Sequence, residues 1–346
     1  MEALLYEPLE EEKVRCILCN HRCVIEAGKR GLCRVRENRG GVLHSLVYGR
    51  LIARHVDPVE KKPLFHFLPG SLSYSIATVG CNFRCRFCQN ADIAQFPADH
   101  RGAIAGAAAT PAEVVASARA SGCRSISYTY TEPTVFFEFA LETCRLAREA
   151  GLGNIFVTNG YMTREAVDRI APVLDAANVD LKAYNDRFYR ETCGARLEGV
   201  LDTLGYLRER GVFLEVTTLL IPGLNDDPGE LAGLAGFLVN ALGPDTPWHV
   251  SRFHPTYRLT DRPPTPPATL HRAREIGLAA GLRYVYTGNV PGDAGENTFC
   301  PRCGAPVVER WGFQVSAVRL ENGRCISCGE RIAGVWNAPP PRGSNS

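Results

Sequence analysis

Three cysteines stand close together in the segment GCNFRCRFCQN, which covers residues 80–90. Cys81, Cys85 and Cys88 are separated by three and by two residues. Thiolates are the ligands that zinc and iron–sulfur clusters prefer. Structural metal sites are closed by four protein ligands, whereas catalytic sites keep one coordination position open. Three cysteines without a fourth nearby therefore predict a metal centre that performs chemistry.

The segments around this loop alternate between strand and helix patterns. Strands are expected at residues 73–79, 125–130, 154–159, 178–183, 213–221, 248–253 and 284–288, with helical patterns between most of them. Successive βαβ units predict a parallel sheet. Because the dinucleotide-binding glycine fingerprint is missing, an α/β fold with a partial or full TIM-like (β/α) barrel is favoured over a Rossmann sheet. The three-cysteine loop follows the first strand, at the end of the barrel where active sites lie.

The 346-residue chain is expected to divide into four parts. These are a cysteine-rich N-terminal metal-binding segment (1–70), the barrel (71–290), a zinc-ribbon- or rubredoxin-like unit (296–335) and a disordered tail (336–346).

Eight further cysteines form two groups of four. The N-terminal group is Cys16, Cys19, Cys23 and Cys33, with His21 as a competing ligand. Its spacing predicts a metal and leaves zinc and a second iron–sulfur cluster open. The C-terminal group is Cys300, Cys303, Cys325 and Cys328, in the knuckles CPRCG and CISCG, which predict a zinc or iron site. Between these knuckles, Trp311, Phe313 and Val315 are expected to form a small core or to dock on the barrel.

Composition and charge describe an ordinary globular protein, with 45% apolar residues, 22% charged residues and a formal net charge of +2. The acidic N-terminus is not a signal peptide, and the sequence holds no apolar run long enough to span a membrane. A cytoplasmic location is expected, where the fourteen cysteines stay reduced or bind metal. The basic run over residues 13–39 is either a solvated face or a site for an acidic partner, and a nucleic-acid partner is not favoured.

The C-x3-C-x2-C pattern, with Phe87 before the last cysteine, resembles the signature of the radical S-adenosylmethionine (SAM) superfamily. The resemblance implies that Cys81, Cys85 and Cys88 hold a 4Fe-4S cluster. In that family the amino and carboxylate groups of SAM chelate the fourth iron. One electron then cleaves SAM to methionine and a 5′-deoxyadenosyl radical, which abstracts a hydrogen atom from the substrate.

Other segments resemble the pyruvate formate-lyase activating enzymes within this superfamily. YTYTEPT places Glu132 where the family binds the SAM amino group, although Tyr-Thr replaces the usual Gly-Gly. VTNGY, VDLKAYND and SRFHPTY match the SAM pocket of the activating enzymes at Thr158, Asn159, Asp180, Lys182 and His254. Apart from the resemblance, Asp180 and Lys182 also fit an internal ion pair, and His254 also fits a satisfied strand-end side chain. No catalytic residue is assigned beyond the cluster.

The whole chain is most similar to the radical SAM enzyme of the AmmeMemoRadiSam system. The resemblance implies an external electron donor of the flavodoxin or ferredoxin type and Memo-like and Ammecr-like partner proteins. A glycyl radical protein is the substrate that the activating enzymes suggest, and a small molecule or RNA is the alternative. Cys193 is the lone candidate for a methyl acceptor. A different class of protein, an iron–sulfur electron carrier or a metal-dependent binding module, also remains, but a carrier closes its cluster with a fourth cysteine.

Overall fold

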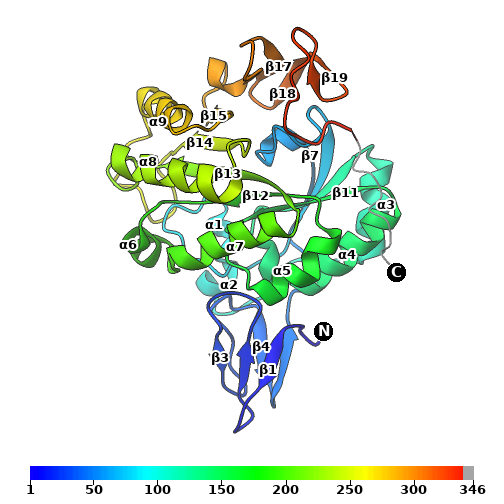
Figure 1. Cartoon of the computed structure of the whole chain (residues 1–346). Helices are drawn as coiled ribbons and strands as arrows, with labels where there is room; N and C mark the ends of the chain where they lie inside the picture. The colour runs from blue at the N-terminus through cyan, green and yellow to red at the C-terminus, as the bar shows by residue number, and fades with distance from the viewer. Residues whose placement is uncertain (338–346) are drawn as a thin grey trace.

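The centre of the molecule is one eight-stranded sheet, seen in the computed structural model, which describes residues 1–337 (Figure 1). The tail expected at residues 336–346 falls outside the described residues from 338 onward. Seven strands are parallel and follow chain order: β8 (Leu72–Ala77), β10 (Ser125–Tyr128), β11 (Gly153–Thr158), β12 (Ala176–Asp180), β13 (Phe213–Leu220), β14 (Trp248–Arg252) and β15 (Val285–Gly288). Each predicted strand is confirmed to within a few residues.

Helices connect these strands in the manner of a partial barrel. The main ones are α3 (Pro111–Ala120), α4 (Phe137–Glu149), α5 (Arg164–Ile170), α7 (Leu197–Glu209), α8 (Pro228–Phe237) and α9 (Pro267–Ala279). Short helices lie at α1 (Ala91–Ala94), α2 (Phe96–Asp99) and α6 (Asp186–Phe188). At the start of α3, the Thr110 side chain accepts from the Glu113 backbone N–H while the Glu113 side chain accepts from Thr110, which is a capping box.

The sheet is an open barrel whose two edges are β15 and β7 (Ala53–Pro58). β7 pairs antiparallel with β8 from Ala53 opposite Ala77 to Pro58 opposite Leu72. The sequence predicts that β7 belongs to the cysteine-rich N-terminal segment, residues 1–70. The reason is that a six-residue edge strand with three exposed residues has no strong apolar alternation. The barrel sheet therefore begins at Ala53, well before its first parallel strand at Leu72.

A small lobe precedes β7 and projects from the barrel, drawn in blue in Figure 1. It contains a sheet of β1 (Tyr6–Pro8), β2 (Val14–Cys16) and β3 (Val24–Ile25) and a hairpin of β4 (Arg36–Arg39) and β5 (Val42–Ser45). β6 (Arg50–Leu51) then pairs with β9 (Ala107–Ala108). The buried Arg36 of this lobe forms an ion pair with the buried Glu138 of α4.

The C-terminal unit contains β16 (Thr298–Phe299), β17 (Pro306–Trp311) and β18 (Gln314–Val318), followed by the pair β19 (Leu320–Glu321) and β20 (Arg324–Cys325). Its buried Val307 and Ile332 pack with Phe65, Tyr284 and Tyr286 from the barrel side. The buried Arg310 guanidinium lies 4.2 Å from the Phe65 ring centre and donates to the Phe65 carbonyl at 2.7 Å. The unit is thus fixed to the gap between the two sheet edges.

Gly80 marks the point where the N-terminal lobe contacts the loop that follows β8. Its φ of 101° lies in the region that only glycine occupies without strain. A Cβ atom here would lie 2.6 Å from Cγ1 of Val35 and 3.3 Å from the Cys33 carbonyl oxygen. The lobe therefore touches the backbone directly before Cys81.

Gly80→Ala is expected to lower the thermal unfolding midpoint, since the added methyl group meets both backbone strain and a steric clash, at a cost of about 1–3 kcal/mol. Differential scanning calorimetry would measure it. The double variant Gly80→Ala/Val35→Ala removes the clash with Val35 but leaves the strained φ. If the two variants unfold at the same temperature, the close approach to Val35 contributes nothing.

Candidate functional site

A cavity of about 470 Å³ opens at the carboxyl ends of the parallel strands and contains the three-cysteine loop. From the loop it is lined by Cys81, Phe83, Cys85, Phe87, Cys88, Gln89 and Asn90, and from the strand ends by Thr129, Tyr130, Thr131, Glu132, Val157, Thr158, Asn159, Asp180, Lys182, Thr217, Leu219 and Ser251. The structure therefore brings five of the six predicted SAM-pocket residues together with the cysteines. This is the end of a parallel barrel where function is expected.

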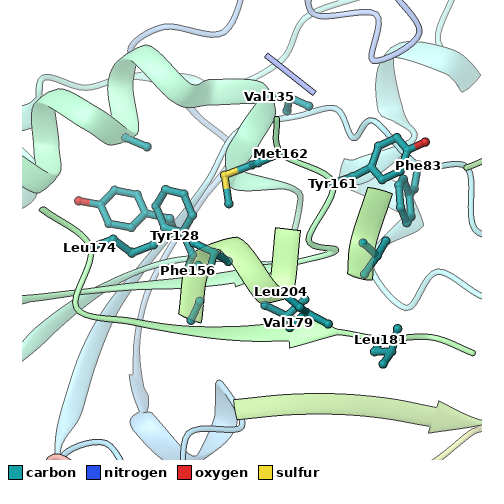
Figure 2. Close-up of a cluster of buried hydrophobic side chains, with 14 of the residues drawn as sticks. Phe83, Tyr128, Val135, Phe156, Tyr161, Met162, Leu174, Val179, Leu181 and Leu204 are labelled. Atoms are coloured by element: carbon teal, nitrogen blue, oxygen red, sulfur yellow. The ribbon is translucent and has the colours of Figure 1, made fainter. Parts of the chain in front are cut away.

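Backbone hydrogen bonds hold the cysteine loop in place. The Arg84 N–H donates to the Cys193 carbonyl at 2.8 Å, and the Arg86 N–H donates to the Thr192 carbonyl at 3.0 Å. Both acceptors belong to a single π-helical turn, Tyr189–Cys193. The buried Phe83 ring packs against Tyr161 at a centroid distance of 5.2 Å, as Figure 2 shows. The thiols are thus presented by a fixed backbone.

Cys193 is buried beside the loop. A hydrogen bond from its side chain lowers the pKa of the Cys85 thiol below its usual value. The Cys193 thiol is fully buried, and it is absent from the residues that line the cavity. This placement does not suit a methyl acceptor, which has to reach SAM, but suits a hydrogen bond to a metal-bound sulfur.

Glu132 is the most strongly held acidic group at the cavity. Its Oε1 accepts from the Thr158 hydroxyl at 2.7 Å and from the Thr134 N–H at 3.1 Å, and its Oε2 accepts from the Asn159 N–H at 2.8 Å. Burial raises its pKa above the usual range, and these donors oppose that rise. A carboxylate offers about four acceptor positions, so Oε2, with one donor, keeps room for a cationic amine in the cavity.

Asn159 connects Glu132 to the cysteine loop. Its side-chain nitrogen donates to Asn82 Oδ1 at 2.7 Å and lies 3.9 Å from the Cys81 sulfur. Its Oδ1, and the hydroxyl of Thr217, are buried without a partner among residues 1–337. Buried polar atoms rarely stay unpaired in native proteins. Asn159 and Thr217 both belong to the residues that line the cavity.

Asp180 and Lys182 pair with each other. Lys182 Nζ donates to Asp180 Oδ2 at 2.8 Å and lies 5.9 Å from the Phe87 ring centre. Burial works to lower the pKa of Lys182, but Asp180 and the Cys85 thiolate raise it well above its usual value. The ion pair that the sequence offered as an alternative role for Asp180 and Lys182 is therefore present. Both residues also line the cavity.

His254 is the predicted residue that the structure does not bring to the site. It is exposed on the loop after β14 and is not among the residues that line the cavity. The loop turns outward here, and the 3.1 Å hydrogen bond from the Thr256 N–H to the Leu259 carbonyl closes the turn.

Sequence reasoning missed a polar cluster at the end of β7, the strand that pairs with β8. Asp57 of β7 accepts from Lys61 at 2.8 Å, from the buried Lys62 at 2.6 Å and from the Tyr130 hydroxyl. Burial lowers the pKa of Lys62 to about 8. Lys61, Lys62 and Tyr130 line the cavity. Tyr130 lies inside the YTYTEPT segment already singled out, whereas Lys61 and Lys62 lie in a turn-rich stretch, which says nothing of a site.

The C-terminal four cysteines form a compact metal-type group. The ligand atoms of Cys300, Cys303, Cys325 and Cys328 all lie within 4.8 Å of one another. The sulfurs of Cys300 and Cys328 are 3.6 Å apart, and those of Cys303 and Cys325 are 3.8 Å apart. A Zn–S distance of about 2.3 Å gives tetrahedral S···S edges of about 3.8 Å. The group fits the zinc-ribbon-like unit, without deciding between zinc and iron.

For Trp311, Phe313 and Val315 the sequence left two alternatives, a small core or docking on the barrel, and the structure excludes the first. Trp311 is 66% exposed and Phe313 is 47% exposed, so neither forms its core. The unit packs instead through Val307 and Ile332. Phe313, at the turn between β17 and β18, lines the cavity. Val315 packs beside Gly70, and the Trp311 ring packs beside Gly292.

The variant Cys303→Ser removes one ligand of this metal. It is expected to release the turn between β17 and β18, which holds Phe313, from the cavity mouth. A bound structural zinc contributes about 10–16 kcal/mol to the folding of so small a unit. Limited proteolysis would show new cuts within residues 296–335 while the barrel stays intact. A digestion pattern identical to that of the unchanged protein would mean that the metal does not hold the unit.

Four N-terminal cysteines also meet at one small cavity, lined by Cys16, Cys19, Cys23 and Cys33 together with His21, Arg36 and Asn82. His21 Nε2 donates to the Asn82 carbonyl at 2.8 Å, which ties the ring to the cysteine loop. The predicted N-terminal group is therefore assembled by the fold.

Comparison with known proteins gives the same class of site. The family model described as the radical SAM superfamily matches residues 75–235. Uncharacterized protein MJ0808 of Methanocaldococcus jannaschii is 48% identical over 96% of this chain and 98% of its own length. The chain belongs to the radical SAM superfamily and is an enzyme of that superfamily.

More distant relatives include named enzymes. Pyruvate formate-lyase 1-activating enzyme of Escherichia coli K12 is 26% identical over 46% of this chain and 65% of the enzyme, so the chain spans just under two thirds of that relative. A radical SAM methyltransferase structure from Sphaerobacter thermophilus aligns with a TM-score of 0.50 at 20% identity, over 66% of this chain and 71% of that one. This likeness concerns the fold. None of the helices formed by residues 1–337 is long and apolar enough to cross a membrane.

Proposed function

We propose that this protein binds a 4Fe-4S cluster through Cys81, Cys85 and Cys88 and uses it to cleave SAM reductively. When bound, the cluster supplies the single electron that splits SAM into methionine and a 5′-deoxyadenosyl radical, which takes a hydrogen atom from the substrate. The chain's own residues bind and orient SAM. Glu132 accepts from the SAM amino group, Thr158 and Asn159 hold Glu132 in position, and the Asp180–Lys182 pair borders the pocket.

The observation that carries this proposal is the site's donor set: Cys81, Cys85 and Cys88 line one cavity together with Glu132, whose carboxylate is held in place by Thr158 and Asn159. A fourth cysteine, Cys193, is near Cys85 but does not line the cavity. An electron carrier needs its cluster closed by protein ligands, whereas this arrangement leaves one side open to a cavity large enough for a small molecule. The alternative of a carrier or a metal-dependent binding module is therefore disfavoured. His254, which is exposed, has no place among the proposed SAM ligands.

For the substrate, we propose a hydrogen donor that reaches the cavity past Phe313. The curated relatives named as pyruvate formate-lyase activating enzymes support a glycyl radical protein. Small molecules and RNA remain alternatives, as do roles for Memo-like and Ammecr-like partner proteins. The electron would come from a flavodoxin- or ferredoxin-like donor. We expect a reducing, cytoplasmic setting, in which cysteines bind metal or stay reduced rather than pair as disulfides.

The experiment is anaerobic reconstitution with iron and sulfide, followed by reductant and SAM, with 5′-deoxyadenosine measured by liquid chromatography and mass spectrometry. The expected result is 5′-deoxyadenosine and methionine in equal amounts. The triple variant Cys81→Ala/Cys85→Ala/Cys88→Ala should form neither, and Cys123→Ala, which alters a buried cysteine far from the loop in sequence, should form both. Failure to detect 5′-deoxyadenosine under several reductants would favour the electron carrier.

A further inference from the structure

We propose that Cys16, Cys19, Cys23 and Cys33 hold a second four-iron cluster rather than zinc, and that it passes electrons from the protein surface to the site at Cys81, Cys85 and Cys88. The assignment of the cluster does not depend on the proposed function. The relay rests on the proposed function.

The first observation is the spacing of the sulfurs. A single zinc ion requires four sulfurs about 3.8 Å apart, given Zn–S bonds of about 2.3 Å. The C-terminal group meets this requirement. Among residues 1–337 it is the one group of three or more metal-ligating side chains whose ligand atoms all lie within 4.8 Å. The N-terminal thiols line one cavity but are not among the groups of such closely spaced ligand atoms in residues 1–337, and the same is true of Cys81, Cys85 and Cys88. A cubane, which places each sulfur on a separate iron, needs such a larger tetrahedron.

The second observation is the polar lining of the N-terminal cavity. Asn82 Nδ2 is buried without a partner among the described residues, and Asn82 lines this cavity. A zinc ion with four thiolates offers this N–H no acceptor besides the thiolates, whereas a cluster adds inorganic sulfides, and hydrogen bonds to cluster sulfurs are common. Arg36 Nη1 lies 3.9 Å from the Cys16 sulfur and is 1% exposed, which places a buried positive charge beside the thiolates.

The third observation is that the two cysteine sites are neighbours. The carbonyl of Cys33 lies 3.3 Å from where a Cβ on Gly80 would stand, and Gly80 directly precedes Cys81. Cys33 and Cys81 also line a common cavity of about 210 Å³. Asn82, which follows Cys81, lines the N-terminal cavity and accepts from Asn159 in the large one. An electron that passes between the two cysteine sites therefore crosses only the segment around Gly80 and Asn82.

The outer side of the shared cavity fits an electron-donating protein. Arg34, Arg84 and Arg258 line it and are exposed, while Asp99 is the acidic residue among its lining side chains. A basic rim favours an acidic partner and speeds its association. In the relay, the donor gives one electron to the N-terminal cluster, which returns to its oxidised state when it passes that electron on. No proton and no other reactant is involved.

The first test counts metals in the full-length protein after anaerobic reconstitution. Two four-iron clusters give about eight irons and eight sulfides per chain, beside the metal of the C-terminal site. The triple variant Cys81→Ala/Cys85→Ala/Cys88→Ala should keep about four irons and four sulfides, because the N-terminal site needs none of those residues. A triple variant that holds zinc and no sulfide would overturn the proposal.

The second test uses electron paramagnetic resonance of the reduced triple variant. Four cysteines close the N-terminal cluster, so adding SAM should leave its signal unchanged. A signal that shifts with SAM would show an open iron and overturn the assignment. The quadruple variant Cys16→Ser/Cys19→Ser/Cys23→Ser/Cys33→Ser should keep the other cluster, whose signal should shift with SAM.

The relay is tested with the quadruple variant and two reductants. Dithionite, a small molecule, should still support 5′-deoxyadenosine formation, whereas reduced flavodoxin should reduce the remaining cluster more slowly than in the unchanged protein. Equal rates with flavodoxin would overturn the relay. If the unchanged protein holds eight irons but forms no 5′-deoxyadenosine, the proposed function fails while the second cluster stands. If 5′-deoxyadenosine forms while the unchanged protein holds only four irons, the proposed function stands and the second cluster fails.

Discussion

Glu132→Gln is expected to raise the SAM concentration required for half-maximal 5′-deoxyadenosine formation by roughly 10- to 150-fold. The reason is that a hydrogen bond to a charged group contributes about 1.5–3 kcal/mol. The substitution keeps the shape of the side chain, and its carbonyl oxygen still accepts from the Thr158 hydroxyl. It removes the negative charge that faces the SAM amino group. Titration with SAM under anaerobic conditions, with 5′-deoxyadenosine as the readout, measures the effect.

The control is Glu149→Gln, which alters an exposed glutamate at the end of α4. It should leave the dependence on SAM unchanged. Iron content should be normal in both variants, since neither residue is a proposed cluster ligand. If Glu132→Gln left the SAM dependence unchanged, Glu132 would be a structural residue that only anchors the turn after β11.

Arg36→Met is expected to lower the free energy of unfolding by about 3–5 kcal/mol, because it leaves the buried carboxylate of Glu138 without its cation. Arg36 and Glu138 are 1% and 4% exposed, and their side chains are in direct contact. The Leu4 N–H, at 2.8 Å from Glu138 Oε1, would be the remaining partner. Urea unfolding followed by circular dichroism gives the difference in free energy.

The double variant Arg36→Met/Glu138→Leu should recover most of this loss, since no buried charge is left unpaired. An additive loss in the double variant would mean that the two side chains act independently. Iron content should be measured in both variants, because Arg36 also approaches Cys16.

The parallel sheet could be predicted from the sequence because its strands are short and apolar, and most of them are followed by a helix with clear start or stop residues. Thr110 and Pro111 are one such signal, and the structure confirms the cap. β7 could not be predicted in the same way. It is an edge strand with exposed residues on both sides of its pleat, so it lacks the alternation that marks a half-buried strand.

The site was predictable where residue type and local spacing carry the chemistry. Once the strands are assigned in the sequence, the cysteines and the polar residues that end β11 and β12 must lie at the carboxyl edge of the parallel sheet. Contacts between distant segments were not predictable. Lys62 reaches the cavity only because β7 joins the sheet beside β8, and Phe313 reaches it only because the C-terminal unit packs on Phe65. His254 lies outside the residues that line the cavity, since a matching motif does not fix where a loop turns.

The C-terminal unit occupies the gap that a closed barrel would not have, and it contributes Phe313 to the rim of the cavity. The groups that would generate the radical and the group that meets the incoming molecule consequently reside on separately folded pieces of one polypeptide. Exchanging the turn at residues 311–314 would alter which molecules are admitted and leave the radical-generating apparatus as it was. Selectivity and reactivity can diverge independently in such an architecture.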